Sequence, residues 1–221
     1  MKILRSLLLL FALNLISASL TFSANGSLLL KKGRLQIVSS PNESKAIRIA
    51  LGNLKSDLNK VLNDDTPIEK SIKEGYNGVQ IVVVNASTAN KKTLADLKPL
   101  NGFESHRVYV NAKNNMVYLV GADDRGTIYA MYTFCEEILG VPPLWFFSSW
   151  QANKKDAIEI SADFNYYAPS PQVRYRTWFP NDQDLLKPWE TQSPKNMEYW
   201  MEAMMRLKLN SIELEQTVRN N

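Results

Sequence analysis

Apolar residues at helical spacing predict an amphipathic helix early in the chain. Five of them are separated by four, three, four and three residues and therefore form one stripe: Ile47, Leu51, Leu54, Leu58 and Val61. Ser40, Pro41 and Glu43 precede this stripe as the N-cap, N1 and N3 residues of a capping box, so we expect the helix to begin there. The apolar stripe should pack on a sheet.

Three further segments have the pattern of β-strands or a hairpin. Residues 33–40 (GRLQIVSS) predict a short strand, and residues 78–87 (GVQIVVVNAS) form an unbroken apolar run typical of a central strand. Residues 104–112 alternate between two faces, and a turn at 113–115 leads into MVYLVGA, which together predict a hairpin. Between them, residues 89–98 (ANKKTLADLK) are compatible with a short helix.

A second long helix is expected after the hairpin. Asp123 or Asp124 is its N-cap, and Gly140 with two prolines beyond it is its stop. Its buried face should comprise Ile128, Tyr132, Cys135 and Leu139. Residues 157–172 then give one last strand and a proline-marked connection. The order of elements predicts an α+β domain in which helices pack against a mostly antiparallel sheet.

From Val173 onward the pattern of strand and helix starts again. VRYRTWF predicts a strand, a loop follows, and Ser193 and Pro194 are the N-cap and N1 of a helix that should reach Leu209, with Asn210 as a left-handed stop. SIELEQ predicts the next strand. Such a β-α-β unit builds a (β/α)8 barrel, which needs eight repeats and about 250 residues. We therefore expect an incomplete barrel in this chain, as the front part of a longer protein.

The first 24 residues have the three-part plan of a secretory signal peptide. Lys2 and Arg5 precede the apolar run 7–16, and small residues follow it. A run of about ten apolar residues is too short to span a bilayer, which takes ~20. We expect a secreted or periplasmic protein with no stable membrane anchor after cleavage. The expected organisation is a signal peptide at 1–24, an α+β accessory domain at 25–170 and the start of a barrel at 171–221.

Composition adds few candidate chemistries. The formal net charge of +4 falls to +2 when Lys2 and Arg5 are removed, which is too weak a surplus to indicate nucleic acid binding. Cys135 is the sole cysteine and is interpreted as a small buried apolar residue. His106 is the sole histidine and is expected to be a partly exposed strand residue, so we predict no metal site and no cofactor.

Two stretches resemble known glycoside hydrolases. GADDRGTIYAMYTFCEEILGVPPLWFFSSW, residues 121–150, is similar to the end of the small α+β domain that precedes the catalytic barrel in the β-hexosaminidase and α-glucuronidase families. Its PPLWFF end and the segment YRTWFPNDQDLLKPW look most like glycoside hydrolase family 115. This resemblance implies an enzyme that removes glucuronic acid from xylan side chains, and a polysaccharide or oligosaccharide substrate.

The loop predicted after the first barrel strand carries the candidate substrate contacts. Asn181, Asp182 and Asp184 could hydrogen-bond sugar hydroxyls there, or Asn181 and Asp182 could simply cap the turn. Trp178 could stack on a sugar or serve in packing. Glu215 lies on one face of the second predicted strand and could line the barrel or be solvated. Large aromatic residues at 145–147 and 150 should seal the small domain against the barrel.

These residues do not supply a complete catalytic pair. A glycosidase needs two carboxyl groups on opposite sides of the sugar, whereas Asp182 and Asp184 are two residues apart on one loop and approach from one side. The catalytic residues therefore stay unknown, and we expect this chain alone to be inactive. A non-catalytic carbohydrate-binding or interaction protein is the alternative.

Overall fold

A six-stranded mixed sheet forms the centre of the protein, which is described by a computed structural model over residues 26–179 and 183–212. The strand order is β3-β2-β4-β6-β5-β8, and the three pairings among β3, β2, β4 and β6 are parallel, whereas β5 is antiparallel to both neighbours. The strands are β2 (Leu35–Val38), β3 (Ile68–Glu69), β4 (Val79–Asn85), β5 (His106–Asn111), β6 (Met116–Gly121) and β8 (Asn165–Ala168).

The α+β interpretation is supported, but the prediction of a mostly antiparallel sheet is wrong. One reason is that helix α2 (Lys45–Leu62) leads from β2 to β3, and a helical crossover returns the chain parallel to the first strand. The interior position of β4 and the hairpin of β5 and β6 are confirmed. A short 3-10 turn, η1 (Ala112–Asn114), joins the two strands of the hairpin.

Helix α2 begins four residues later than its capping pattern predicts. Ser44, not Ser40, is the N-cap, and its side chain accepts a hydrogen bond from the Ile47 nitrogen. Ser40 instead accepts from the Asn42 nitrogen in a local turn, which is the competing use of a serine hydroxyl near a proline. The predicted apolar stripe is confirmed, because all five of its residues are buried in the core.

Helix α4 (Asp124–Phe134) is buried on all sides from Gly126 onward. Asp123 is its N-cap, and a π-helical turn, η2 (Cys135–Leu139), extends it to Gly140, which ends it in the left-handed conformation. The helix starts hard against the end of β6, where a Cβ on Gly121 would lie 1.9 Å from the Thr127 nitrogen. Only a glycine fits there without a backbone shift.

The remaining elements are a short helix and a second, two-stranded sheet. Helix α3 (Lys91–Ala95) lies in the connection after β4. One strand was predicted within residues 157–172, but the chain forms two: β7 (Ala157–Ser161) pairs with β1 (Ser27–Lys31), and β8 joins the main sheet. The chain thus passes from one sheet to the other between Ser161 and Asn165, which a continuous strand could not do.

A parallel strand pair with two helices makes up the C-terminal part. Its elements are β9 (Thr177–Trp178), α5 (Gln183–Gln192), α6 (Pro194–Arg206) and β10 (Ser211–Ile212), and β9 pairs with β10 in parallel. Ser193 caps α6 as predicted. The predicted stop at Asn210 is wrong: α6 ends at Arg206, and Lys208 takes the left-handed conformation with a φ of 58°.

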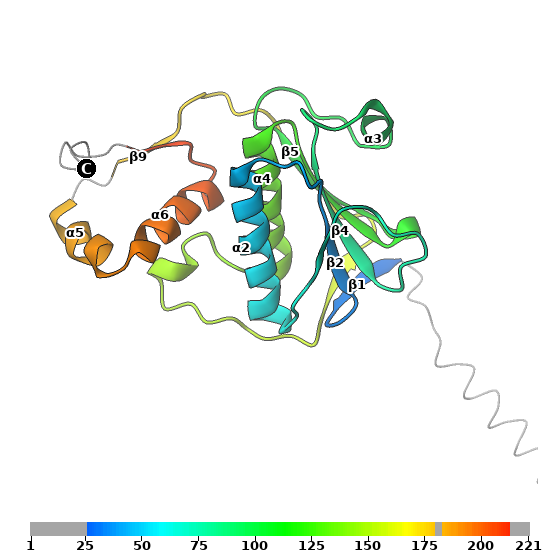
Figure 1. Cartoon of the computed structure of the whole chain (residues 1–221), viewed down its shortest axis with the longest axis horizontal. Helices are drawn as coiled ribbons and strands as arrows, with labels where there is room; N and C mark the ends of the chain where they lie inside the picture. Colours follow the sequence, from blue (N-terminus) through cyan, green and yellow to red (C-terminus); the bar gives the residue numbers. More distant parts are fainter. Residues whose placement is uncertain (1–25, 180–182, 213–221) are drawn as a thin grey trace, which may run out of the picture.

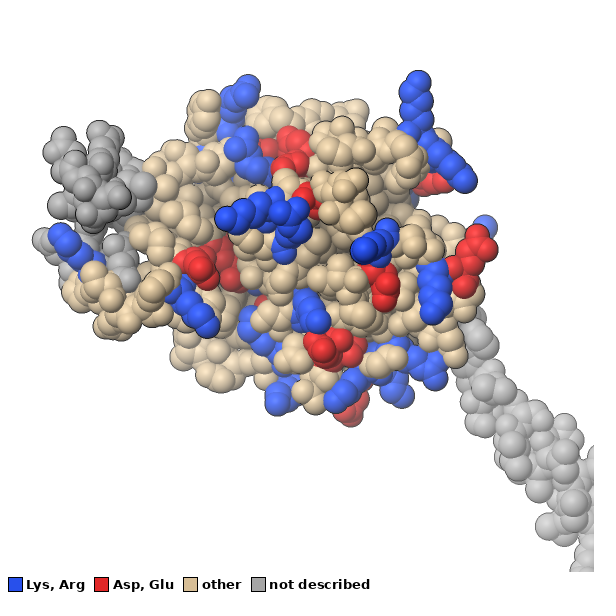
Figure 2. All heavy atoms as spheres, in the orientation of Figure 1, with Lys and Arg blue, Asp and Glu red and all other residues tan. Residues whose placement is uncertain are grey.

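The elements lie in three layers, as Figure 1 shows: the sheet, then α2 and α4 side by side on one of its faces, then α6 with β9. This arrangement explains why α4 is buried on every side from Gly126 onward. On the face shown in Figure 2, Lys and Arg side chains lie among Asp and Glu side chains. Within residues 26–179 and 183–212, none of the helices has the length and apolar character needed to cross a membrane.

Candidate functional site

The strand ends that should carry the candidate site lie next to each other. Trp178 and Ile212 are register partners at the ends of β9 and β10, so the segments that follow both strands leave from the same end of the pair. In a parallel barrel this is the end at which substrates bind. Asn181, Asp182 and Glu215 lie outside the described residues, so their roles as substrate contacts stay predictions.

The sequence suggested that Asp184 lies in a loop, but the structure places it in a helix. It belongs to the first turn of α5, although its side chain is outside the description. Pro188 lies inside this helix. A proline removes one backbone donor from a helix without necessarily ending it. The two aspartates therefore do not share one loop.

Trp178 is part of an aromatic cluster that joins the two parts of the chain. Its ring is edge-on to Trp200 at 5.9 Å and to Phe147 at 6.4 Å between centroids. Phe146 stacks on Tyr199 at 4.0 Å, and Trp145 meets the same tyrosine edge-on. The short turn η3 (Trp145–Phe147) thus makes the predicted seal.

Two members of the expected seal behave differently from the rest. Trp150 packs against the core of the α+β part instead of the strand pair. Phe147 contacts Trp189 at 5.0 Å, yet 40% of its surface stays exposed. Rings that are partly exposed beside the end of β9 offer the kind of surface on which a sugar can stack.

A buried carboxylate lies at the opposite end of the strand pair. The side chain of Glu104 is 1% exposed. It forms an ion pair with Arg125, whose Nε lies 2.6 Å from Oε1, and it accepts hydrogen bonds from Asn210 Nδ2 at 3.0 Å and from Arg176 Nη2. Arg176 also donates to the Tyr129 hydroxyl, and burial raises the pKa of that hydroxyl to about 12. We call these five residues the Glu104 cluster.

A second buried ion pair connects α2 with α6. Arg206 donates to Asp57 at 2.6 Å through Nη2 and to Glu202 at 2.7 Å through Nε, and both Asp57 and Arg206 are almost fully buried. Lys60 also pairs with Asp57, at 2.8 Å. Burial works against the charge of Arg206, but the neighbouring acidic groups raise its pKa above the ordinary value. The guanidinium also lies over the Tyr132 ring.

His106 is buried, contrary to the prediction of a partly exposed strand residue. Its Nδ1 lies 3.2 Å from the Glu104 carbonyl oxygen and its Nε2 lies 3.1 Å from the Thr133 hydroxyl. Tyr166 stacks on the ring and Tyr129 meets it edge-on. The alternation of β5 did not predict this burial, because helix α4 covers one face of the strand and β8 extends the sheet beyond it. Burial lowers the pKa of His106 to about 4.

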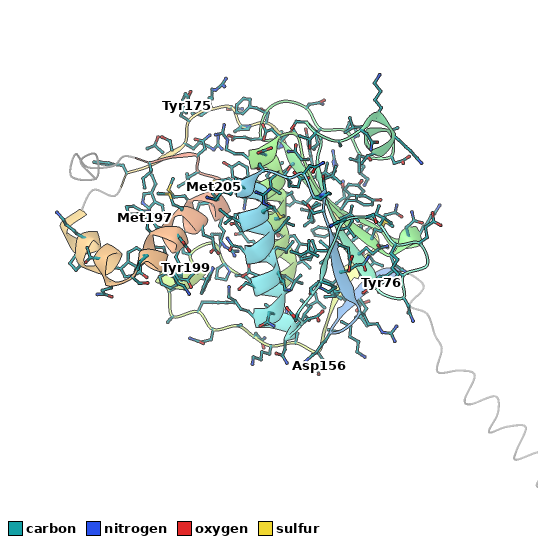
Figure 3. All side chains as sticks on the ribbon, viewed as in Figure 1. Tyr76, Asp156, Tyr175, Met197, Tyr199 and Met205 are labelled. Atoms are coloured by element: carbon teal, nitrogen blue, oxygen red, sulfur yellow. The ribbon has the colours of Figure 1, made fainter. Side chains whose placement is uncertain are left out.

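A cleft of about 670 Å³ opens between α2 and α6. Three methionines at four-residue spacing line its α6 side: Met197, Met201 and Met205. Figure 3 shows Met205 where the end of α6 approaches α2. Trp178 does not line this cleft, whereas Trp145 and Tyr199 of the aromatic cluster do. Over residues 26–179 and 183–212, no group of three or more His, Cys, Asp or Glu side chains could hold a metal ion.

The Glu104 cluster and the Asp57–Arg206 pair were not predicted from the sequence. Both join residues that are far apart in the chain, by 72 positions for Glu104 and Arg176 and by 149 for Asp57 and Arg206. One local signal existed for the second pair: Asp57 falls between apolar positions of the α2 stripe, where a charge needs a partner. No comparable signal marked Glu104.

The structure is similar to solved glycoside hydrolases. A 4-O-methyl-α-glucuronidase of family GH115 with specificity for decorated arabinogalactans matches 84% of this chain, with a TM-score of 0.71 and 24% identity, over 25% of its own length. The Streptomyces plicatus β-hexosaminidase matches 71% of the chain, with a TM-score of 0.46 and 13% identity, over 26% of its length.

A GH20 exo-β-N-acetylglucosaminidase from Vibrio harveyi matches 86% of the chain, with a TM-score of 0.45 and 12% identity, over 23% of its length. The chain thus spans about a quarter of each of these solved structures. No protein-family model and no curated protein matches it. The fold shared with the GH115 enzyme covers most of the chain.

Proposed function

We propose that this chain is the front part of a secreted or periplasmic glycoside hydrolase of the family 115 type. Residues 1–24 are its signal peptide, 25–170 its accessory domain and 171–221 the start of its catalytic barrel. The observation that carries this proposal is the fold shared with a GH115 enzyme over 84% of the chain, at a TM-score of 0.71. The parallel pairing of β9 with β10 around two helices agrees with a barrel start.

In this proposal the residues after β9 and β10 form part of the substrate rim. Trp178, Asn181, Asp182, Asp184 and Glu215 would contact the sugar, because both strands end on the same side of the pair. Glycosidases place two carboxyl groups on opposite sides of the scissile bond, ~5 Å apart in retaining enzymes and ~6.5–9.5 Å apart in inverting ones. We expect at least one of these carboxyl groups to come from the rest of the longer protein.

The proposed reaction is release of glucuronic acid from side chains of a plant polysaccharide. Xylan is our first candidate substrate, and decorated arabinogalactan is the second because the similar GH115 enzyme is specific for it. Incubating the product of the whole reading frame with glucuronoxylan and, separately, with arabinogalactan should release glucuronic acid or its 4-O-methyl form from one of them. Release from neither would contradict the proposal.

The reading frame itself gives the simplest check. We expect the genomic sequence to continue in frame after codon 221 and to encode further strand-helix units, and we expect the 221-residue chain alone to give no turnover. Glucuronic acid release by the purified 221-residue chain would refute the incomplete-barrel part of the proposal. A stop codon followed by an unrelated gene would refute it as well.

A non-catalytic carbohydrate-binding protein is the second candidate. The observation in its favour is the partly exposed ring of Phe147 beside Trp178 and Trp189. Calorimetric titration of this chain with xylan oligosaccharides would measure such binding directly. Binding that is lost in Phe147→Ala, in a chain whose gene ends at codon 221, would favour this candidate over the enzyme.

A further inference from the structure

Glu104 occupies an unusual position in the chain. It lies two residues before β5. Its φ is 56°, in the left-handed region that residues other than glycine and asparagine seldom adopt. Its backbone nitrogen donates to Asp123, the N-cap of α4, at 2.9 Å. The surrounding fold thus holds this residue in place and directs its carboxylate to the start of the strand pair.

Besides Arg125, the partners of the carboxylate are the two residues that directly precede β9 and β10. Arg176 directly precedes β9 at Thr177, and Asn210 directly precedes β10 at Ser211. Each donates to a different oxygen of Glu104. A single carboxylate from the α+β part therefore reaches the starting points of both strands.

The same two residues are bonded to each other. The Arg176 nitrogen donates to Asn210 Oδ1 at 2.9 Å, and the Asn210 and Ser211 nitrogens donate to the Arg176 carbonyl oxygen at 3.1 and 3.3 Å. Arg176 Nε donates to the Lys208 carbonyl oxygen at 2.8 Å. These bonds define the register of β9 and β10, so Glu104 holds the groups that set that register.

Charge explains why one carboxylate suffices for several donors. Hydrogen bonds between an ionised carboxylate and arginine are about twice as strong as neutral ones. Because the side chain of Glu104 is 1% exposed, solvent does not compete for its oxygens. A buried carboxylate that lost its arginine partners would be strongly unfavourable, so the cluster has one good arrangement.

We propose that Glu104 is a positioning residue that fixes the starts of β9 and β10 against α4. It acts through Arg176 and Asn210. Two-residue strands cannot hold such a register by their own ladder, which offers few hydrogen bonds. This positioning role does not depend on the proposed function. Only an effect of Glu104 on substrate contacts at the other end of the strand pair would rest on it.

Hydrogen exchange in this chain tests the proposal. In Glu104→Gln, we expect the amides of Arg176, Asn210 and Ser211 to exchange at least about tenfold faster, while amides of β4 and β6 change less than about twofold. Glu104→Asp keeps the charge but is one methylene shorter, so it should restore part of the protection. A residue with only a general role in stability would speed exchange throughout the molecule.

Glu136→Gln is the matched control. Glu136 also bonds across the junction, to Lys208 at 3.1 Å, but is partly exposed, so its substitution should leave the three amides unchanged. If Glu104→Gln does not fold, Arg176→Gln makes the same comparison, because Arg125 still pairs with Glu104. Unchanged exchange at the three amides, or an equal rise in β4 and β6, would overturn the proposal. No sugar or turnover enters this measurement, so its failure would leave the proposed function standing.

Discussion

The two buried ion clusters at the junction differ in what they connect. The Asp57–Arg206 pair joins the middle of one helix to the last residue of another, inside a layer of packed helices. The Glu104 cluster joins a loop residue to the starts of two strands. Both use a carboxylate with little or no exposure, but Arg206 is 2% exposed, whereas 47% of the Arg125 side chain is exposed. The first pair should contribute more to stability and the second more to register.

The largest effect on the free energy of unfolding is expected at the Asp57–Arg206 pair. Arg206→Met keeps an unbranched apolar stem but removes the guanidinium, which leaves Asp57 buried with Lys60 as its remaining partner. Breaking a buried ion pair in this way should lower the free energy of unfolding by about 3 kcal/mol. Urea denaturation measures this change. Lys60→Met is the control, because Lys60 is partly exposed and its loss should cost less than about 1 kcal/mol. Equal losses of stability in the two variants would contradict the view that the buried arginine matters more than the partly exposed lysine.

Acid should destabilise the protein through His106, which lies beside Glu104. Burial lowers its pKa to about 4 from an ordinary value of 6.5, so the folded protein resists protonation that the unfolded chain accepts. Its contribution to stability is therefore complete above pH 6.5 and is lost progressively as the pH falls toward 4. We expect a loss of about 2 kcal/mol between pH 7 and 4.5.

Comparison with His106→Gln isolates this effect from the titration of carboxylates. The glutamine can hydrogen-bond Thr133 but does not titrate, so its free energy of unfolding should fall less between pH 7 and 4.5. Denaturation curves at the two pH values measure the difference. Parallel losses in both proteins would show that His106 does not titrate as its burial implies.

The aromatic seal should give the smallest of the three effects and can be divided between two neighbours. Phe146 stacks on Tyr199 at 4.0 Å, whereas Phe147 is more exposed and contacts Trp178 and Trp189 at longer range. Phe146→Ala should lower the free energy of unfolding by about 1.5 kcal/mol and Phe147→Ala by less than about 1 kcal/mol. Thermal unfolding followed by circular dichroism would rank them. The reverse order would mean that the seal depends on the exposed ring.

Local periodicity predicted the elements whose burial repeats along the chain. The stripe of α2, the apolar run of β4 and the Ser193–Pro194 start of α6 all follow from neighbours in sequence. Two predicted helix ends were wrong: Ser44 rather than Ser40 caps α2, and Lys208 rather than Asn210 takes the left-handed conformation after α6. Tertiary contacts decide such cases, since Asn210 is occupied by its bonds to Arg176 and Glu104.

The candidate site was predictable only in part, for the same reason. The position of Trp178 at a strand end and the aromatic seal follow from composition and order along the chain. Helix α5 was not predicted, because it contains Pro188 and proline is more typical of a loop than of a helix interior. The burial of His106 and the Glu104 cluster depend on which strands and helices become neighbours, and spacing in the sequence carries no record of that.

The polarity of the strand pair separates two kinds of evolutionary constraint. Glu104, Arg176 and Asn210 lie at the starts of β9 and β10, while Trp178 and Ile212 mark their ends. We therefore expect changes in the few residues directly after Trp178 and Ile212 to leave the bonds of the cluster intact, as long as Lys208 and Asn210 keep their places before β10. A lineage could therefore exchange the segments that follow the strands and acquire new specificity without rebuilding the anchor, and a protein engineer could graft such segments onto the same base.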